Sequence, residues 1–140
     1  MNLQSSTLKN DETGEPLHVQ QRKQIEAFRD AWDGAGHRRQ PRVSVSRSIF
    51  AITTDLDRAY FGGNANSVDQ IGMIDEKTRA IFGRSYAAEP DVLVKELAQD
   101  EAIEAADTLL LTIPSQLGVD YNSHLLEDIL RYVAPELGWR

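Results

Sequence analysis

The sequence predicts an α/β protein whose strands run parallel to one another. Segments with strand patterns alternate with segments with helix patterns, which gives four strand–helix units in succession. One predicted strand, residues 108–113, is almost continuously apolar, as is typical of a strand covered on both faces of a parallel sheet. This alternation predicts one parallel sheet, in which right-handed crossovers join neighbouring strands.

The first half of the chain carries the clearest element patterns. A short extended segment begins close to the first residue, at Leu3, and stops at the polar loop of residues 9–15. Residues 17–34 place apolar side chains three and four positions apart, which predicts an amphipathic helix. Residues 42–52 start with alternating valines and serines and end wholly apolar, so they are predicted to be a strand.

The rest of the chain continues the alternation of strand and helix patterns. Proline, glycine and capping residues mark where each element begins and ends. The predicted elements are a helix from Thr54 or Asp55 to the glycines at 62 and 63, a loop with some helix over 64–77, a strand over 80–83, a loop over 84–89, a helix over 90–106, the strand over 108–113, and a last helix from Asp120 to Gly138.

Composition excludes several classes of function. The 140 residues correspond to one domain, and 15 Lys and Arg against 22 Asp and Glu leave a net charge of −7. This balance argues against a dedicated nucleic-acid surface. The absence of cysteine excludes disulfides, thiolate metal sites and cysteine nucleophiles. No apolar run is long enough to span a membrane and no signal-peptide pattern is present, so we expect a cytoplasmic protein.

Polar residues gather where the predicted strands end, which is where parallel α/β proteins bind ligands. These positions are rich in hydroxyls and amides and poor in carboxylates and histidines, a pattern that favours binding of a polar cofactor over acid–base hydrolysis. The alternative is that they are ordinary polar loops. His18, His37 and His124 show no metal-ligand spacing, so no metal site is predicted.

Arg47 is the most specific single residue. It lies inside the predicted strand 42–52 among apolar neighbours, where a buried guanidinium needs an anion or a carboxylate. Two interpretations stay open: Arg47 belongs to a binding site, or it forms an internal ion pair with one of the acidic residues.

Three segments together resemble a known family. They are Arg42–Ile52 (RVSVSRSIFAI), Ile81–Pro90 (IFGRSYAAEP) and Ala106–Tyr121 (ADTLLLTIPSQLGVDY). In this order they resemble the C-terminal part of the bacterial luciferase-like flavin-dependent monooxygenases. Met1–Leu8 (MNLQSSTL) is also similar to an internal strand of that family, so the resemblance covers nearly the whole chain.

The resemblance implies a fold and a chemistry. The family forms a (β/α)8 TIM barrel, which needs about 250 residues. Residues 1–140 would then be a single C-terminal half-barrel domain with the front half absent. The family uses reduced flavin (FMN), or a deazaflavin coenzyme in some branches, with oxygen and a small-molecule substrate, and a flavin reductase can supply the flavin. We therefore expect an oxidoreductase in the intact form and an inactive isolated chain.

The resemblance also assigns site residues by position. Arg47 would lie near the flavin and the substrate as the catalytic residue, and Ser6 and Thr7 would line the flavin ring. Gln116 would border the site, and Arg84 would close over the flavin phosphate.

The sequence departs from the family at a few of these positions. Some branches carry a histidine where this chain has Ile49, which argues against a histidine-assisted mechanism. Other branches carry Tyr and His at the positions of Pro114 and Gln116, and Arg79 is an alternative to Arg84 for the phosphate.

Two other classes of function stay open. The first is a catalytically inactive half-barrel that oligomerises, because four parallel strands leave two unpaired edges and an apolar inner face. Its partner would be a second copy or a separate front-half chain. The second is a small flavodoxin-like binding module, which the acidic loop of residues 9–15 argues against because that fold needs a phosphate loop there.

Overall fold

The computed structural model describes residues 2–139, and they form two compact units. Unit 1 comprises residues 2–47, 69–84 and 100–110. Unit 2 comprises residues 48–68, 85–99 and 111–139. Within the described range, no helix has both the length and the apolar character needed to cross a membrane.

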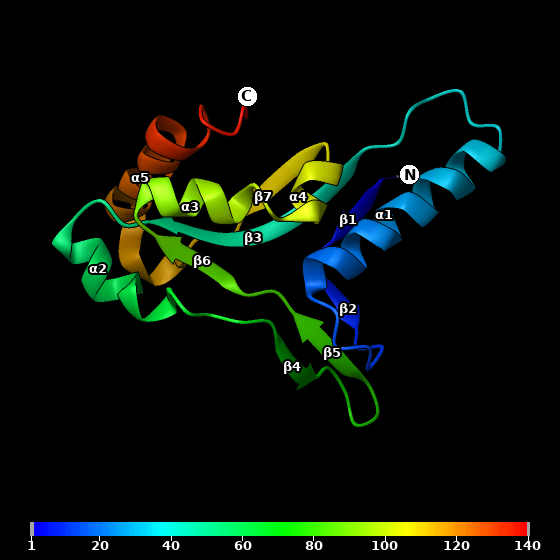
Figure 1. The fold of residues 1–140 in the computed structure, drawn as a ribbon, viewed down its shortest axis with the longest axis horizontal. Coiled ribbons are helices and arrows are strands. Elements are labelled where there is room, and N and C mark those ends of the chain that lie inside the picture. Colours follow the sequence, from blue (N-terminus) through cyan, green and yellow to red (C-terminus); the bar gives the residue numbers. More distant parts are fainter. Residues whose placement is uncertain (1, 140) are drawn as a thin grey trace. The chain divides into compact units, whose positions relative to one another are not determined.

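The described residues contain seven strands together with α-helices and shorter helical turns, and Figure 1 labels the strands and α-helices. In chain order the elements are β1 (Leu3–Ser5), β2 (Thr7–Lys9), α1 (Leu17–Gly34), β3 (Val43–Ala51), α2 (Asp55–Phe61), η1 (Gly62–Asn64), β4 (Gln70–Met73), β5 (Arg79–Phe82), β6 (Ser85–Ala88), α3 (Pro90–Leu97), α4 (Glu101–Ala105), β7 (Thr108–Leu111), η2 (Ser115–Leu117), α5 (Gly118–Asp128) and the π-helical turn η3 (Ile129–Val133).

The long strand β3 organises a sheet of four strands. β1 pairs with its first residues in parallel, and β6 pairs with its last four residues in parallel. The prediction of an α/β fold with parallel strands is therefore confirmed. β7 also pairs with β3. In a barrel whose strands follow one another in chain order, β7 would instead pair with β6, the preceding parallel strand. Asp107 fixes the pairing of β7 with β3, because its carboxylate accepts from Val43 N–H at 2.8 Å and its own N–H donates to the Val43 carbonyl at 2.9 Å.

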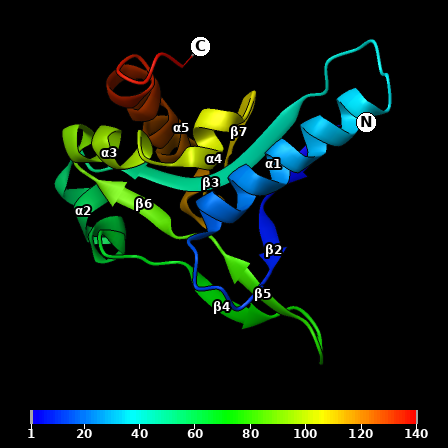
Figure 2. The ribbon, with the colours of Figure 1, turned by 45° about the vertical axis from the view of Figure 1, so that its right-hand side comes forward.

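Unit 1 buries one face of α1 against strands and α4. Its core consists of Ile25, Val43, Val45 and Ala102, all 0% exposed. The unit also contains an antiparallel sheet of order β2-β5-β4, whose strands lie side by side in Figures 1 and 2. In this sheet the ring of Phe82 lies over Gly72, where a Cβ atom would approach it to 3.1 Å.

Unit 2 is built around an aromatic core. The rings of Phe50 and Phe61 stack with centroids 4.0 Å apart, and Ala87 and Leu125 complete the buried cluster. The parallel pairing of β3 with β6 brings the Phe50 and Ala87 positions together. The polar residues that follow β3 are therefore held on a rigid base.

Three predicted elements are confirmed with boundaries within a residue or two. They are the helix over 17–34, the strand over 42–52 and the short helix that Thr54 caps. Each has a strong local signal: a helical apolar stripe, valine–serine alternation, and a threonine with an aspartate three residues later.

Several predictions are wrong. The segment 64–77 contains β4, and the strand predicted over 80–83 is antiparallel, as β5 of the small sheet. The loop predicted over 84–89 contains β6, which is the parallel partner of β3. β4 (QIGM) and β6 (SYAA) lack the consecutive large apolar residues that marked β5 (RAIF) and β7 (TLLL) as strands.

Element ends in the last third also differ from prediction. The helix predicted over 90–106 is interrupted by Asp100, which caps α4 as a separate helix. β7 is half-buried rather than covered on both faces. The last helix begins at Gly118 instead of Asp120, and with the π-helical turn η3 it ends at Val133 instead of Gly138. The extended segment predicted from Leu3 is present as the two short strands β1 and β2.

Candidate functional site

Buried polar side chains gather in two clusters, one in each unit. The arginine network of unit 1 consists of Ser5, Gln21, Arg47 and Asp100. The aspartate–histidine cluster of unit 2 consists of Thr53, Asp57, Tyr121, His124 and Asp128.

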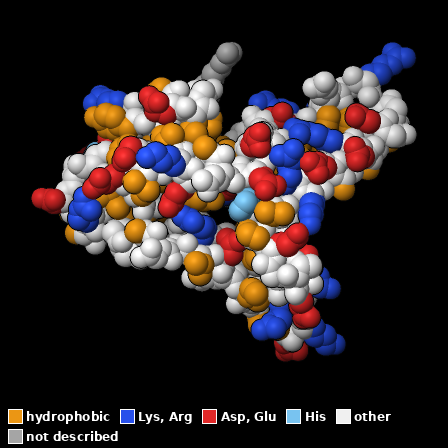
Figure 3. All heavy atoms as spheres, in the orientation of Figure 1, with side chains coloured by type: hydrophobic (Ala, Val, Ile, Leu, Met, Phe, Trp, Pro, Cys, Tyr) orange, Lys and Arg blue, Asp and Glu red, His pale blue; other side chains and the backbone are white. Residues whose placement is uncertain are grey.

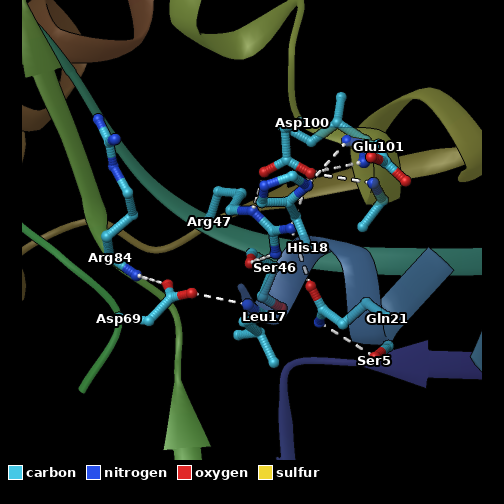
Figure 4. A network of polar contacts seen from close by, with 12 residues as sticks. Ser5, Leu17, His18, Gln21, Ser46, Arg47, Asp69, Arg84, Asp100 and Glu101 are labelled. Carbon is cyan, nitrogen blue, oxygen red and sulfur yellow. Dashed lines mark hydrogen bonds and ion pairs between the residues drawn. The ribbon is translucent and has the colours of Figure 1, made fainter. Parts of the chain in front are cut away.

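The arginine network is a chain of hydrogen bonds closed by an ion pair. Arg47 donates from Nε to Asp100 Oδ2 at 2.7 Å and from Nη2 to Asp100 Oδ1 at 2.9 Å. The same Nη2 donates to Gln21 Oε1 at 2.8 Å, and Gln21 Nε2 donates to Ser5 Oγ at 3.0 Å. Figure 4 shows these side chains pointing toward one another. A bidentate arginine–carboxylate pair of this kind is the strongest geometry available to the two groups.

Asp100 also determines local structure. Its Oδ1 accepts from the N–H groups of Ala102 and Ile103, at 3.1 and 3.0 Å, and so caps α4. One carboxylate therefore balances a buried cation and satisfies two free N–H groups of a helix.

For Arg47, the internal ion pair anticipated from the sequence is confirmed. Arg47 is 5% exposed, and a further donor, Nη1, reaches the Ser46 carbonyl at 2.8 Å. Its positive charge is therefore already balanced by Asp100 within the fold. Contact between Arg47 and a flavin stays a prediction.

The other predicted site residues lie in different surroundings. Ser6 is exposed between β1 and β2, Thr7 is half-buried opposite Phe82, and Gln116 is exposed in η2 of unit 2. Ser6 thus directly follows Ser5, a member of the arginine network.

Arg84 lies just before β6 and contributes its backbone to a second polar contact in unit 1. Its N–H donates to Asp69 Oδ1 at 2.9 Å, while Asp69 Oδ2 accepts from Leu17 N–H at 2.6 Å at the start of α1. The side chain of Arg84 extends away from the Arg47 guanidinium in Figure 4. The structure therefore does not bring these two predicted cofactor-binding arginines together.

The aspartate–histidine cluster lies where β3 ends. Thr53 and Thr54 follow the strand and begin α2, and Asp57 is the third residue of that helix. Thr54 Oγ1 accepts from Asp57 N–H at 3.2 Å, while Asp57 Oδ2 accepts from Thr54 N–H at 2.8 Å, which forms a capping box. Tyr121, His124 and Asp128 come from α5, one turn apart on the same side of the helix.

The two carboxylates of the cluster meet the same histidine. His124 Nε2 lies 2.9 Å from Asp57 Oδ1 and 3.5 Å from Asp128 Oδ2. Tyr121 OH donates to Asp57 Oδ1 at 2.5 Å, and Thr53 Oγ1 donates to Asp128 Oδ2. Asp57 is fully buried and Asp128 is 8% exposed, whereas the side chain of His124 is 32% exposed.

The hydrogen bonds of the cluster change two acidities. Burial alone would raise the pKa of Asp57, but donation from Tyr121, Thr54 and His124 outweighs it and holds this pKa well below its usual range. Burial and the hydrogen bond to the Asp57 carboxylate raise the pKa of Tyr121 well above its usual range. The cluster therefore holds an ionised carboxylate beside a neutral phenol.

Sequence analysis missed this cluster, and the expectation that strand ends are poor in histidines and carboxylates is wrong at the end of β3. Asp57, His124 and Asp128 offer ligand atoms that all lie within 4.8 Å of one another. The i, i+4 spacing of His124 and Asp128 on a helix was a usable signal. Asp57 could not be added to that pair, because it lies 67 positions from His124 in the sequence.

No protein-family model, curated protein or solved structure matches the chain. The resemblance to the luciferase-like family therefore stays a prediction, and function has to be argued from the fold and from the two clusters.

Proposed function

We propose that this chain is the C-terminal portion of a luciferase-like flavin-dependent oxidoreductase, with its parallel strands corresponding to half of a (β/α)8 barrel. One observation carries the proposal: the segments that resemble the family coincide with parallel strands and the residues that follow them. RVSVSRSIFAI contains β3, and IFGRSYAAEP contains its parallel partner β6. Polar residues follow these strands, as ligand binding in parallel sheets requires.

The residues present fit a flavin in part. Ser6 in unit 1 and Gln116 in unit 2 are exposed polar side chains that follow strands, so each by itself is able to hydrogen-bond the polar edge of a flavin ring. Arg47 does not fit direct contact, because Asp100, Gln21 and the Ser46 carbonyl already engage its donors. In this proposal Arg47 is a positioning residue that fixes β3. A bound reduced flavin would supply the electrons for reaction with oxygen.

Flavin titration of the whole chain tests the proposal. We expect saturable quenching of FMN fluorescence, with affinity reduced in Ser6→Ala and Gln116→Ala and unchanged in Ser123→Ala, a control on α5. Oxygen uptake in the presence of a flavin reductase should stay at background, because the chain is proposed to be only part of the enzyme.

Two results would contradict the proposal. Absence of saturable binding of FMN, reduced FMN and deazaflavin up to millimolar concentration would exclude a flavin site. Tight flavin binding with full turnover by this chain alone would show that no further half is needed.

A second candidate function, a non-catalytic module that assembles with a second copy, is favoured by exposed apolar side chains on the small antiparallel sheet. Ile71, Met73 and Phe82 are 55%, 57% and 38% exposed, and β4 is an edge strand of that sheet. Figure 3 shows hydrophobic side chains at the surface over this region. An exposed apolar edge strand is a site where two chains can pair.

Sedimentation velocity over a range of concentrations tests the assembly function. We expect a concentration-dependent dimer that Met73→Lys disrupts, while Val119→Lys, a change at an 81% exposed residue of unit 2, leaves it intact. A chain that stays monomeric at every concentration would exclude this function.

A further inference from the structure

We propose that Asp57, His124 and Asp128 form a binding site for one divalent cation of the zinc class. The site goes beyond flavin binding and does not depend on it. Its three donor atoms are a histidine nitrogen and two carboxylate oxygens, a ligand set that Zn²⁺ accepts.

The donor atoms lie close enough together for small side-chain movements to bring all three onto one cation, because they are all within 4.8 Å of one another. Around a Zn²⁺ ion with bonds of about 2.0–2.2 Å, neighbouring ligand atoms lie about 3.0–3.5 Å apart. His124 Nε2 lies 2.9 Å from Asp57 Oδ1 and 3.5 Å from Asp128 Oδ2. One ring nitrogen therefore lies within 3.5 Å of an oxygen of each carboxylate.

The charge of the cluster points to a cation as well. Asp57 and Asp128 are both buried, and in the part of the chain that the structure describes their ion pairs are with His124 alone. One imidazolium balances at most one of two negative charges. Buried carboxylates ordinarily are paired or bind a metal, and a divalent ion would offset both.

The remaining hydrogen bonds would hold the ligands in place after binding. Thr54 holds Asp57 Oδ2 through its N–H and its hydroxyl, both at 2.8 Å, and Thr53 holds the Asp128 carboxylate. Metal binding displaces the Nε2 proton of His124 to solvent and leaves Oδ1 of Asp57 with a lone pair for Tyr121. The side chain of His124 is 32% exposed, so the cluster reaches solvent on its histidine side.

Isothermal titration of the full chain with Zn²⁺ tests the site. We expect one equivalent to bind, and affinity to fall at least tenfold in His124→Gln and in Asp128→Asn. His18→Gln is the matched control, because His18 lies beside Glu101 in unit 1, and its Zn²⁺ affinity should equal that of the wild type. When Co²⁺ replaces Zn²⁺, the wild-type chain should show a visible absorption band that is absent in His124→Gln.

Paramagnetic broadening by Mn²⁺ is measured on the wild-type chain, so its result does not depend on whether a variant folds. Amide signals of Thr53, Asp57 and His124 should be the first to broaden as substoichiometric Mn²⁺ is added. The proposal is overturned if no stoichiometric binding occurs, if His124→Gln binds as tightly as the wild type, or if broadening centres elsewhere. Any of these would make the cluster a hydrogen-bond network only.

Discussion

The arginine network and the aspartate–histidine cluster both contain buried charged side chains, yet they differ in charge balance. In unit 1 one guanidinium meets one carboxylate in bidentate geometry, with Gln21 and backbone carbonyl and N–H groups taking further bonds. In unit 2 two carboxylates share one histidine. A balanced network serves the fold, whereas an unbalanced one has capacity left for a ligand.

The largest expected effect is loss of the unit 1 ion pair. Asp100→Ala leaves Arg47 buried without its carboxylate and removes the cap of α4, so unfolding free energy should fall by about 3–5 kcal/mol. Urea denaturation followed by circular dichroism measures it. Glu104→Ala is the control, since its 3.5 Å pair with Arg22 is exposed, and it should cause no measurable change. Equal effects of the two variants would contradict a structural role for Asp100.

Removal of the central carboxylate in unit 2 should cost less. Asp57→Ala removes the capping box of α2 and leaves Tyr121 and Thr54 without their acceptor, so we expect a loss of about 2–3 kcal/mol. The same denaturation experiment measures it, with Asp55→Ala, at an exposed residue of the same helix, as the control. A loss as large as that of Asp100→Ala would remove the energetic distinction between the clusters.

A smaller effect should separate two glutamines of α1. Gln21→Leu removes the link between Ser5 and Arg47 and should cost about 1–3 kcal/mol. Gln24→Leu is the matched control, because Gln24 Oε1 is buried with no hydrogen-bond partner among the described residues, so leucine should be neutral or stabilising there. Thermal unfolding of both variants measures the difference. A greater loss of stability in Gln24→Leu than in Gln21→Leu would contradict the hydrogen bonds assigned to Gln21.

The smallest expected effect is a change of folding stability with pH, which appears at acidic pH and not near neutrality. The pKa of Asp57 is depressed in the folded state, so below pH of about 4 the unfolded chain binds a proton that the folded chain does not. The stability that Asp57 contributes is therefore present above that pH and is lost as the pH falls further toward the folded pKa. Urea midpoints at pH 3 and pH 6, in chelator, should differ less in Asp57→Asn than in the wild type. An unchanged difference would contradict the depressed pKa.

The fold was predictable where one segment carries its own signal. The stripe of α1, the alternation in β3 and the Thr54 cap with Asp57 each fix an element locally. The strands β4 and β6 were not recognised, because they lack the consecutive large apolar residues that marked the equally short β5 and β7 as strands.

The candidate sites divide in the same way. The sequence showed that Arg47 must meet an anion or a carboxylate, and the structure supplied Asp100, 53 positions away. His124 and Asp128 were adjacent on a helix face, but nothing in the sequence connected them with Asp57. Local patterns reveal which groups need partners, whereas the identity of the partner depends on long-range packing.

By itself the sequence determined the α/β class, the parallel character of the main sheet, the long helix α1 and the requirement of a partner for Arg47. Only the tertiary structure decided that β5 is antiparallel, that β7 pairs with β3, and that Asp57 meets His124. The physical reason is that helix periodicity, caps and burial patterns are properties of neighbouring residues. Strand partners and charge partners are instead chosen by the free energy of the whole unit.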